Sequence, residues 1–202
     1  MAHDIAVAAG KRRSSMMRLS PNSSKISVIC WISVADASIG VYKVPSNIKR
    51  IYLEGGAWVF GSFIMDGKAC SNVKIYGRGV LSGARLHLRE SHMVEAKNGA
   101  DGIIVDGIVI ADYSFFAVRL LGADNEVSWT KIVGGWIYNC DGIAAYANST
   151  IRNCFIWAND DNIKIYRRLA VGRLHPNSLA MPSIPYTYFL SVSVMGCGCV
   201  SV

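Results

Sequence analysis

The sequence has few charged residues and no long apolar run. Charged residues make up 17% of the 202 residues, whereas apolar residues make up 51%. This composition excludes an intrinsically disordered chain and allows one domain with a substantial core. A membrane-spanning helix needs about 20 apolar residues, and even the apolar stretch 26–40 is interrupted by Asp36 and several serines. We therefore predict a globular protein without a membrane partner.

The six cysteines include no Cys-x-x-Cys pair, the spacing that is typical of structural zinc sites. Cys140 and Cys154 are compatible both with buried thiols and with a disulfide. No cofactor is expected from the sequence.

The excess of basic residues is confined to the two ends of the chain. The net charge is +7, to which residues 1–50 contribute +6, residues 51–161 contribute −3 and residues 162–202 contribute +4. Nucleic-acid binding requires basic side chains on one folded surface. We therefore predict no nucleic-acid partner.

Three regions of the chain differ in character. Residues 1–25 combine many Ser, Lys and Arg with no apolar periodicity, so we expect a disordered or misassigned N-terminal segment. Residues 26–166 consist of short apolar segments with period-two alternation, separated by Gly and Asn, which predicts short β-strands. Residues 167–202 contain three prolines and no acidic residue. We expect an irregular tail there, either a cap or a frame-shifted end.

Parts of the central region resemble one another. VDGIVIAD, VGGWIYNCDG and RNCFIWANDD each place an apolar triplet before polar residues and Asp, and the triplets begin at Ile108, Trp136 and Phe155. Repeats of 20–30 residues built only of short strands indicate a β-solenoid. An antiparallel sandwich would use Asp-Gly hairpin turns instead. Because Asp106-Gly107 and Asp141-Gly142 recur at a similar phase, we predict an all-β fold, a right-handed parallel β-helix.

Three carboxylates, Asp141, Asp160 and Asp161, lie among residues that otherwise read as buried strand. The interval of 19 residues from Asp141 to Asp160 is one short coil, which would stack the two side chains on neighbouring coils. Carboxylates held so close repel one another, and at least one pKa should rise. Glycosidic cleavage needs such a division into acid and base, with about 6.5–9.5 Å between the carboxyls in an inverting enzyme. Calcium binding and turn capping are the alternatives.

The motif VGGWIYNCDGIAAY followed by NDDNIKIY resembles glycoside hydrolase family 49, the dextranase and isopullulanase family. IYLEGGAWVFGSF (51–63) and IYGRGVLSGARL (75–86) resemble the coils that precede the site in that family, so that the resemblance covers about residues 48–166. It implies a right-handed parallel β-helix, which in family members follows a β-sandwich. It also implies a secreted, inverting endo-hydrolase that cuts α-glucan at dextran-like α-1,6 linkages, although no clear signal peptide is present.

The resemblance also implies roles for individual residues. Asp160 matches the general acid, and Asp141 and Asp161 match the pair that activates water. Lys164 matches a lysine that could hydrogen-bond a sugar hydroxyl or keep a neighbouring carboxylate ionised. Three aromatic residues could stack against sugar or belong to the core: Trp136, Tyr138 and Tyr146.

The resemblance ends at Tyr166, where family members continue into further coils. The implied protein is thus a truncated family member, with a polysaccharide as its partner and a monomeric state. One alternative is a polygalacturonase-like β-helix, which expects a Gly-His-Gly and an Arg-Ile-Lys that this sequence lacks. The other is a non-catalytic β-helical fragment that binds carbohydrate.

Overall fold

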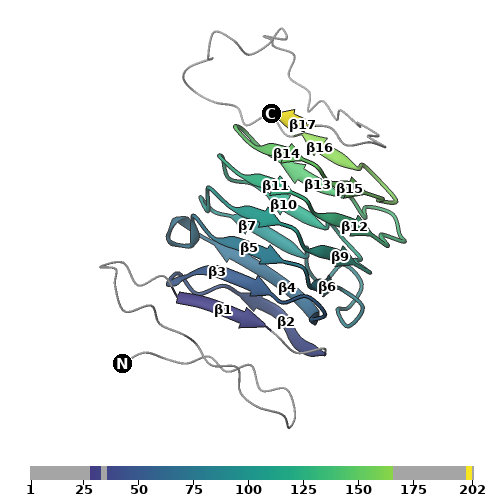
Figure 1. Cartoon of the computed structure of the whole chain (residues 1–202). Coiled ribbons are helices and arrows are strands. Elements are labelled where there is room, and N and C mark those ends of the chain that lie inside the picture. Colours follow the sequence, from purple (N-terminus) through teal and green to yellow (C-terminus); the bar gives the residue numbers. More distant parts are fainter. Residues whose placement is uncertain (1–27, 33–35, 166–198, 202) are drawn as a thin grey trace, which may run out of the picture.

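The structure, a computed structural model, describes residues 28–32, 36–165 and 199–201. The expectations for residues 1–25, and for all of 167–202 except 199–201, concern segments outside this part. Within it, parallel strands stack into a β-solenoid of about five turns (Figure 1). The predicted all-β parallel solenoid is confirmed, and the antiparallel sandwich is wrong.

The described strands form two hydrogen-bonded sheets. One is seven-stranded and consists, in spatial order, of β1 (Val28–Ile32), β3 (Ile48–Leu53), β5 (Lys74–Gly77), β8 (Ile104–Asp106), β11 (Glu126–Ser128), β14 (Thr150–Arg152) and β17 (Cys199–Ser201). All of its pairings are parallel except the last, in which β17 runs antiparallel to β14.

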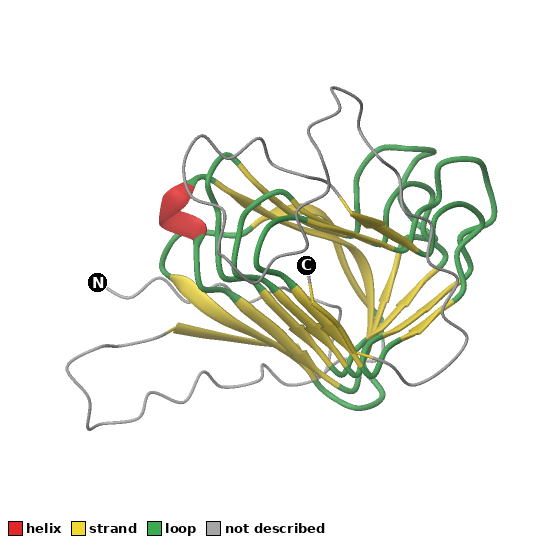
Figure 2. Cartoon of the chain, turned by 90° about the horizontal axis from the view of Figure 1, so that it is seen from above, coloured by secondary structure: helices red, strands yellow, loops and turns green. Residues whose placement is uncertain are grey.

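The second sheet is ten-stranded and bends into two faces at β4. Its strands are β2 (Ala37–Lys43), β4 (Trp58–Asp66), β6 (Val80–Ser82), β7 (Val94–Lys97), β9 (Val109–Ala111), β10 (Val118–Leu120), β12 (Lys131–Val133), β13 (Ile143–Ala145), β15 (Phe155–Ile156) and β16 (Ile163–Ile165). The first residues of β4 pair with β6 and its last residues with β7. Seen from above, the strands therefore form three faces around one interior (Figure 2).

Gly61 makes the corner within β4. Its φ of 141° is unfavourable for other residues, and a Cβ at this position would lie 2.2 Å from the carbonyl oxygen of Gly40. The backbones of β2 and β4 thus approach each other more closely than a side chain allows. The bend separates the β6 face from the β7 face in every later coil.

The core consists of columns of equivalent side chains from successive coils, all of which point inward. Ile51, Ile75, Val105, Val127 and Ile151 pair in register along the seven-stranded sheet, and all five are buried. Aliphatic and mostly β-branched side chains suit such a column because each packs on its equivalent in the coils above and below. The short apolar triplets of the sequence become strands for this reason.

The coil alignment predicted from the triplets needs correction. Val109 pairs with Lys131, and Lys131 pairs with Phe155, so successive coils on this face are 22 and 24 residues apart. Trp136 lies in the loop after β12 and aligns with neither triplet. The phase assigned to the Asp-Gly pairs is wrong too, because Asp106 ends β8 in one sheet whereas Asp141 precedes β13 in the other. Unequal loop lengths hide the true period.

The described part of the chain contains free cysteines and one short helical turn. Cys70, Cys140 and Cys154 are free thiols, which decides between the two predicted states of Cys140 and Cys154. The helical element between β4 and β5 is a 3-10 turn, η1 (Lys68–Cys70). No described helix is long and apolar enough to cross a membrane.

Candidate active site

The candidate site lies in the loops that join the face containing β6 to the face containing β7. These loops span residues 83–93, 112–117, 134–142 and 157–162, and they lead into β7, β10, β13 and β16 in turn. Successive loops stack on one corner of the solenoid, away from η1 (Figure 2). Asp141 comes from the third loop, and Asp160 and Asp161 come from the fourth.

The strand register after these loops decides which acids align. Ile143 pairs with Ile163, and the amide of Gly142 donates to the carbonyl of Asp161 at 2.8 Å. The coil is therefore 20 residues long here, and Asp141 aligns with Asp161. The predicted stacking of Asp141 on Asp160 is wrong by one residue.

The structure nevertheless brings the three carboxylates together. One carboxylate oxygen from each of Asp141, Asp160 and Asp161 lies within 4.8 Å of the other two. Asp160 and Asp161 are neighbours in the sequence, and Asp141 comes from the adjacent coil. The expectation that a single coil interval gathers the three acids is thus correct in outcome, although its register is not.

Asp141 is the buried member of this trio. Its side chain is fully shielded from solvent, and its Oδ2 contacts Nζ of Lys164. Burial raises the pKa of Asp141 above its ordinary value, and the charges of Asp160 and Asp161 raise it further, while Lys164 acts in the opposite direction. The Oδ1 atom has no hydrogen-bond partner among the described residues. The sequence-based expectation of one raised pKa in the trio is therefore met at Asp141.

Asp160 and Asp161 are only partly buried. Oδ2 of Asp160 accepts a hydrogen bond from the amide of Asn139 at 3.2 Å, and Oδ1 accepts one from the amide of Asp161 at 2.9 Å. Oδ2 of Asp161 lies 3.2 Å from Nζ of Lys164. These contacts fix the orientation of both carboxylates at the edge of the solenoid, where a ligand can reach them.

Lys164 holds two of the three acids. It is paired in register with Ala144 on β13, and its ammonium contacts both Asp141 and Asp161. The same nitrogen lies 5.0 Å from the centre of the Phe116 ring, at a cation–π distance. These contacts are those that the ionic role expected for Lys164 requires, and both of its expected roles stay predictions.

The trio could in principle bind a metal ion, since carboxylate oxygens are calcium ligands. Calcium, however, takes about 6–8 oxygen ligands, and the ammonium of Lys164 already lies against Asp141 and Asp161. A divalent cation would compete with this ammonium for the same oxygens. The residues present therefore fit an ion-paired cluster better than a calcium site.

Gly142 lets the coils approach each other at the site. A Cβ at this position would lie 2.4 Å from the carbonyl oxygen of Asn162 and 2.5 Å from Cγ2 of Ile156. The glycine after Asp141 is thus required by packing between the third and fourth loops. A side chain here would push the two coils apart next to the buried Asp141.

Exposed aromatic residues flank the acids in the sequence. Trp136 and Tyr138, from the third loop, are 69% and 71% exposed, and Trp157, from the start of the fourth, is 63% exposed. The rings of Trp136 and Trp157 lie edge to face with centroids 6.3 Å apart. The core alternative is therefore wrong for Trp136 and Tyr138. Sequence reasoning missed Trp157, although it stands three residues before Asp160.

Tyr146 is not brought to the acids. It follows β13 directly, whereas Asp141 precedes that strand. Five residues of extended chain separate the two backbones by about 16 Å. Tyr146 thus belongs to the turn at the opposite end of β13, where it is half-buried.

Two curated proteins resemble this chain, and no family model matches it. The dextranase of Arthrobacter globiformis is 31% identical over 148 residues, an alignment that covers 61% of this chain and 23% of the dextranase. The dextranase of Arthrobacter sp. (strain CB-8) shows the same identity and coverage. The chain thus spans about a quarter of the length of these relatives.

Proposed function

We propose that this chain carries the catalytic face of a glycoside hydrolase that cleaves α-glucan within the polymer, at dextran-like α-1,6 linkages. The observation that carries the proposal is the convergence of Asp141, Asp160 and Asp161 within 4.8 Å on one corner of the solenoid. The similarity to two dextranases supports dextran as the substrate. Because polymers of this kind do not cross membranes, the proposal includes an extracellular location.

The three acids take different roles in this proposal. Asp160 is the general acid that protonates the leaving glycosidic oxygen, as the resemblance to glycoside hydrolase family 49 implies. Asp161, whose carboxylate is only partly buried, activates the attacking water. Asp141 belongs to the same pair, and its burial supports an indirect part: through Lys164, which contacts both carboxylates, it orients Asp161.

The stereochemical outcome is a separate part of the proposal. Family resemblance favours inversion, for which carboxyl groups about 6.5–9.5 Å apart leave room for the water. The nearest oxygens of the trio are closer than that, within 4.8 Å. Proton NMR of the first product released from an α-linked oligosaccharide decides the matter, because an inverting enzyme gives the β-anomer and a retaining enzyme gives the α-anomer.

The proposed activity is tested by reducing-sugar release from dextran, pullulan and polygalacturonate. We expect release from dextran, and we expect Asp160→Asn to lower kcat by about 100-fold to 10,000-fold, the usual contribution of general acid catalysis. Asp124→Asn is a matched control, since Asp124 is exposed in the turn before β11 and has a positive φ of 59° that Asn tolerates. Release from polygalacturonate alone would replace the proposal with the pectin-type alternative.

A second candidate function is carbohydrate binding without cleavage. The exposed edge-to-face pair of Trp136 and Trp157 favours it, because such rings offer flat surfaces to sugar. Saturable binding of dextran oligosaccharides by a folded, β-rich chain that releases no reducing sugar would support this function and exclude the enzyme.

A further inference from the structure

A second polar site lies on the loops that precede the aspartates. Residues 83–93 and 112–117 stack below 134–142 and 157–162 in the order of the coils. Together with β2 and β7 they border a hollow of about 230 Å³. The lining residues on which the argument depends are Lys43, Glu90, His92, Glu95, Lys97 and Phe115.

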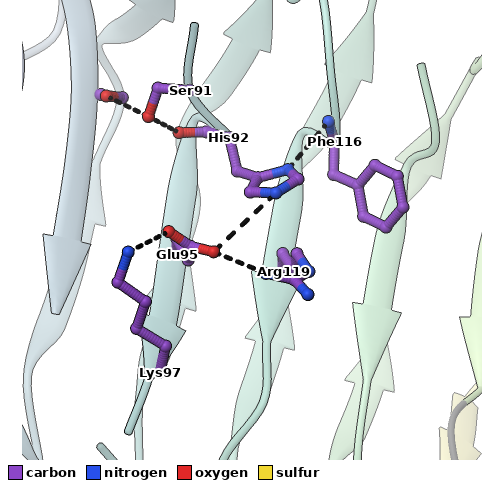
Figure 3. A network of polar contacts seen from close by, with 7 residues as sticks. Ser91, His92, Glu95, Lys97, Phe116 and Arg119 are labelled. Carbon is purple, nitrogen blue, oxygen red and sulfur yellow. Dashed lines mark hydrogen bonds and ion pairs between the residues drawn. The ribbon is translucent and has the colours of Figure 1, made fainter. Parts of the chain in front are cut away.

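Glu95 lines the hollow and is the centre of a network of polar contacts (Figure 3). Its side chain is almost fully buried, and its Oε1 accepts a hydrogen bond from Nη1 of Arg119 at 2.7 Å. Its Oε2 accepts one from Nζ of Lys97 at 3.2 Å. A carboxylate and an ammonium thus stand side by side at the wall, offering an acceptor and a donor to a ligand hydroxyl.

His92 forms a flat wall of the hollow. Its Nδ1 accepts a hydrogen bond from the amide of Phe116 at 3.3 Å, so that the hydrogen of the neutral ring is on Nε2. That nitrogen lies 3.8 Å from Oε1 of Glu95, which is longer than a hydrogen bond. Burial lowers the pKa of His92 to about 4, so the ring is neutral near pH 7. It stacks on Phe115 with centroids 4.0 Å apart.

The charges of the lining indicate the class of ligand. Two lysines, Lys43 and Lys97, are balanced by two glutamates, Glu90 and Glu95. Arg119, which contacts Glu95, is not among the residues that line the hollow. An acidic sugar would require an excess of positive charge, which the lining lacks. A flat aromatic wall with balanced hydroxyl-binding groups fits a neutral hexose.

The strand register places the hollow in line with the acids. Val94 pairs with Val118, Val118 with Ile143, and Ile143 with Ile163. His92 and Asp141 each stand two residues before a member of this column, with one coil between them. Two coil steps correspond to about 10 Å along the solenoid axis, a span that a short oligosaccharide bridges.

We propose that this hollow is a distal subsite, which binds one neutral hexose unit of the same α-glucan chain whose scissile bond lies at Asp160 and Asp161. The inference rests on the proposed function for the identity of the glucan. It adds that the polymer runs along the solenoid axis toward the N-terminal coils, with Phe115 as a stacking residue and Lys43 as a hydroxyl-binding residue.

The test compares the binding of isomaltose and isomaltohexaose to the full chain carrying Asp160→Asn, by calorimetry and by amide NMR. We expect the longer sugar to bind about tenfold more tightly and to shift the amide signals of His92 and Phe115. Adding Phe115→Ala or Lys43→Ala should remove most of this tenfold gain, the loss of about 1.4 kcal/mol of contact. Lys68→Ala, another exposed lysine but on η1, should leave it unchanged.

The possible outcomes separate this inference from the proposed function. Suppose that the wild-type chain releases no sugar from dextran, but isomaltohexaose binds more tightly than isomaltose and both variants lose this length effect. The subsite is then supported and the proposed enzyme activity is not. If dextran is cleaved while both variants keep the full length effect, the enzyme stands and the subsite is overturned. Binding of trigalacturonate as tightly as isomaltohexaose, or no binding of isomaltohexaose, would also overturn it.

Discussion

Lys164 and Asp141 form an ion pair beneath the surface of the candidate site, with side chains 8% and 0% exposed. The pair joins two coils, since Asp141 precedes β13 and Lys164 lies within β16. Lys164 also contacts Asp161, so one cation serves a buried carboxylate and a partly exposed one. One cation therefore links the stability of the solenoid to the position of the proposed water-activating carboxylate.

Removing the ammonium should destabilise the chain. Lys164→Met leaves Asp141 buried without a counter-charge, which typically costs about 3–5 kcal/mol. Urea unfolding at pH 7 measures this loss. In the double variant Asp141→Asn/Lys164→Met no buried charge remains, and we expect much of the stability to return. Equal losses in the single and double variants would contradict the coupling.

The buried His92 should make stability fall in mild acid. Burial lowers the pKa of His92 to about 4 in the folded chain, whereas the unfolded value is about 6.5. Between these values the unfolded chain binds the proton more readily, so stability decreases as the pH falls from about 6.5 to about 4, by up to about 3 kcal/mol. Urea unfolding at several pH values follows this decrease.

Substitution of His92 isolates its share of the pH effect. His92→Asn keeps an acceptor for the amide of Phe116 but does not titrate, so its stability should depend less on pH in this window. His87→Asn is the matched control because His87 is exposed. A variant that loses stability in acid as steeply as the wild type would refute the assignment.

A methyl group at Gly142 should disturb the site. In Gly142→Ala the new Cβ would lie 2.4 Å from the carbonyl oxygen of Asn162, and overpacking of this kind costs about 1–3 kcal/mol. We expect a lower thermal midpoint and a loss of the proposed activity, because Asp141 must move. Gly55→Ala, whose Cβ would meet nothing nearer than Cβ of Arg78 at 3.6 Å, should change neither.

The exposed tryptophans should contribute to sugar binding and little to folding. Trp136→Ala and Trp157→Ala each remove a surface ring, so we expect stability changes within about 0.5 kcal/mol. The loss of aromatic contact should weaken binding of isomalto-oligosaccharides by up to about tenfold. Trp58→Ala, in β4 outside the two loops, is the control. Unchanged affinity in both loop variants would show that these residues do not bind the sugar.

The general architecture was predictable, while the coil alignment was not. Short strands with Gly and Asn punctuation led to the parallel solenoid, which the structure confirms. The alignment at Trp136 failed because the loop 134–142 is longer than the loop 112–117 before it. A triplet in a long loop looks like a strand triplet in the sequence, and only the pairing of Lys131 with Phe155 distinguishes them.

The sequence by itself determined the kind of fold and the chemistry available to it. Alternating aliphatic segments can bury their faces only by stacking, and Asp141, Asp160 and Asp161 are the acids in the segment that resembles a glycosidase motif. Tertiary structure alone decided that Asp141 aligns with Asp161, that Asp141 is the buried acid and that Lys164 neutralises it. These properties depend on neighbours from adjacent coils, and the packing of Ile143 on Ile163 sets that register whatever the spacing of the polar residues.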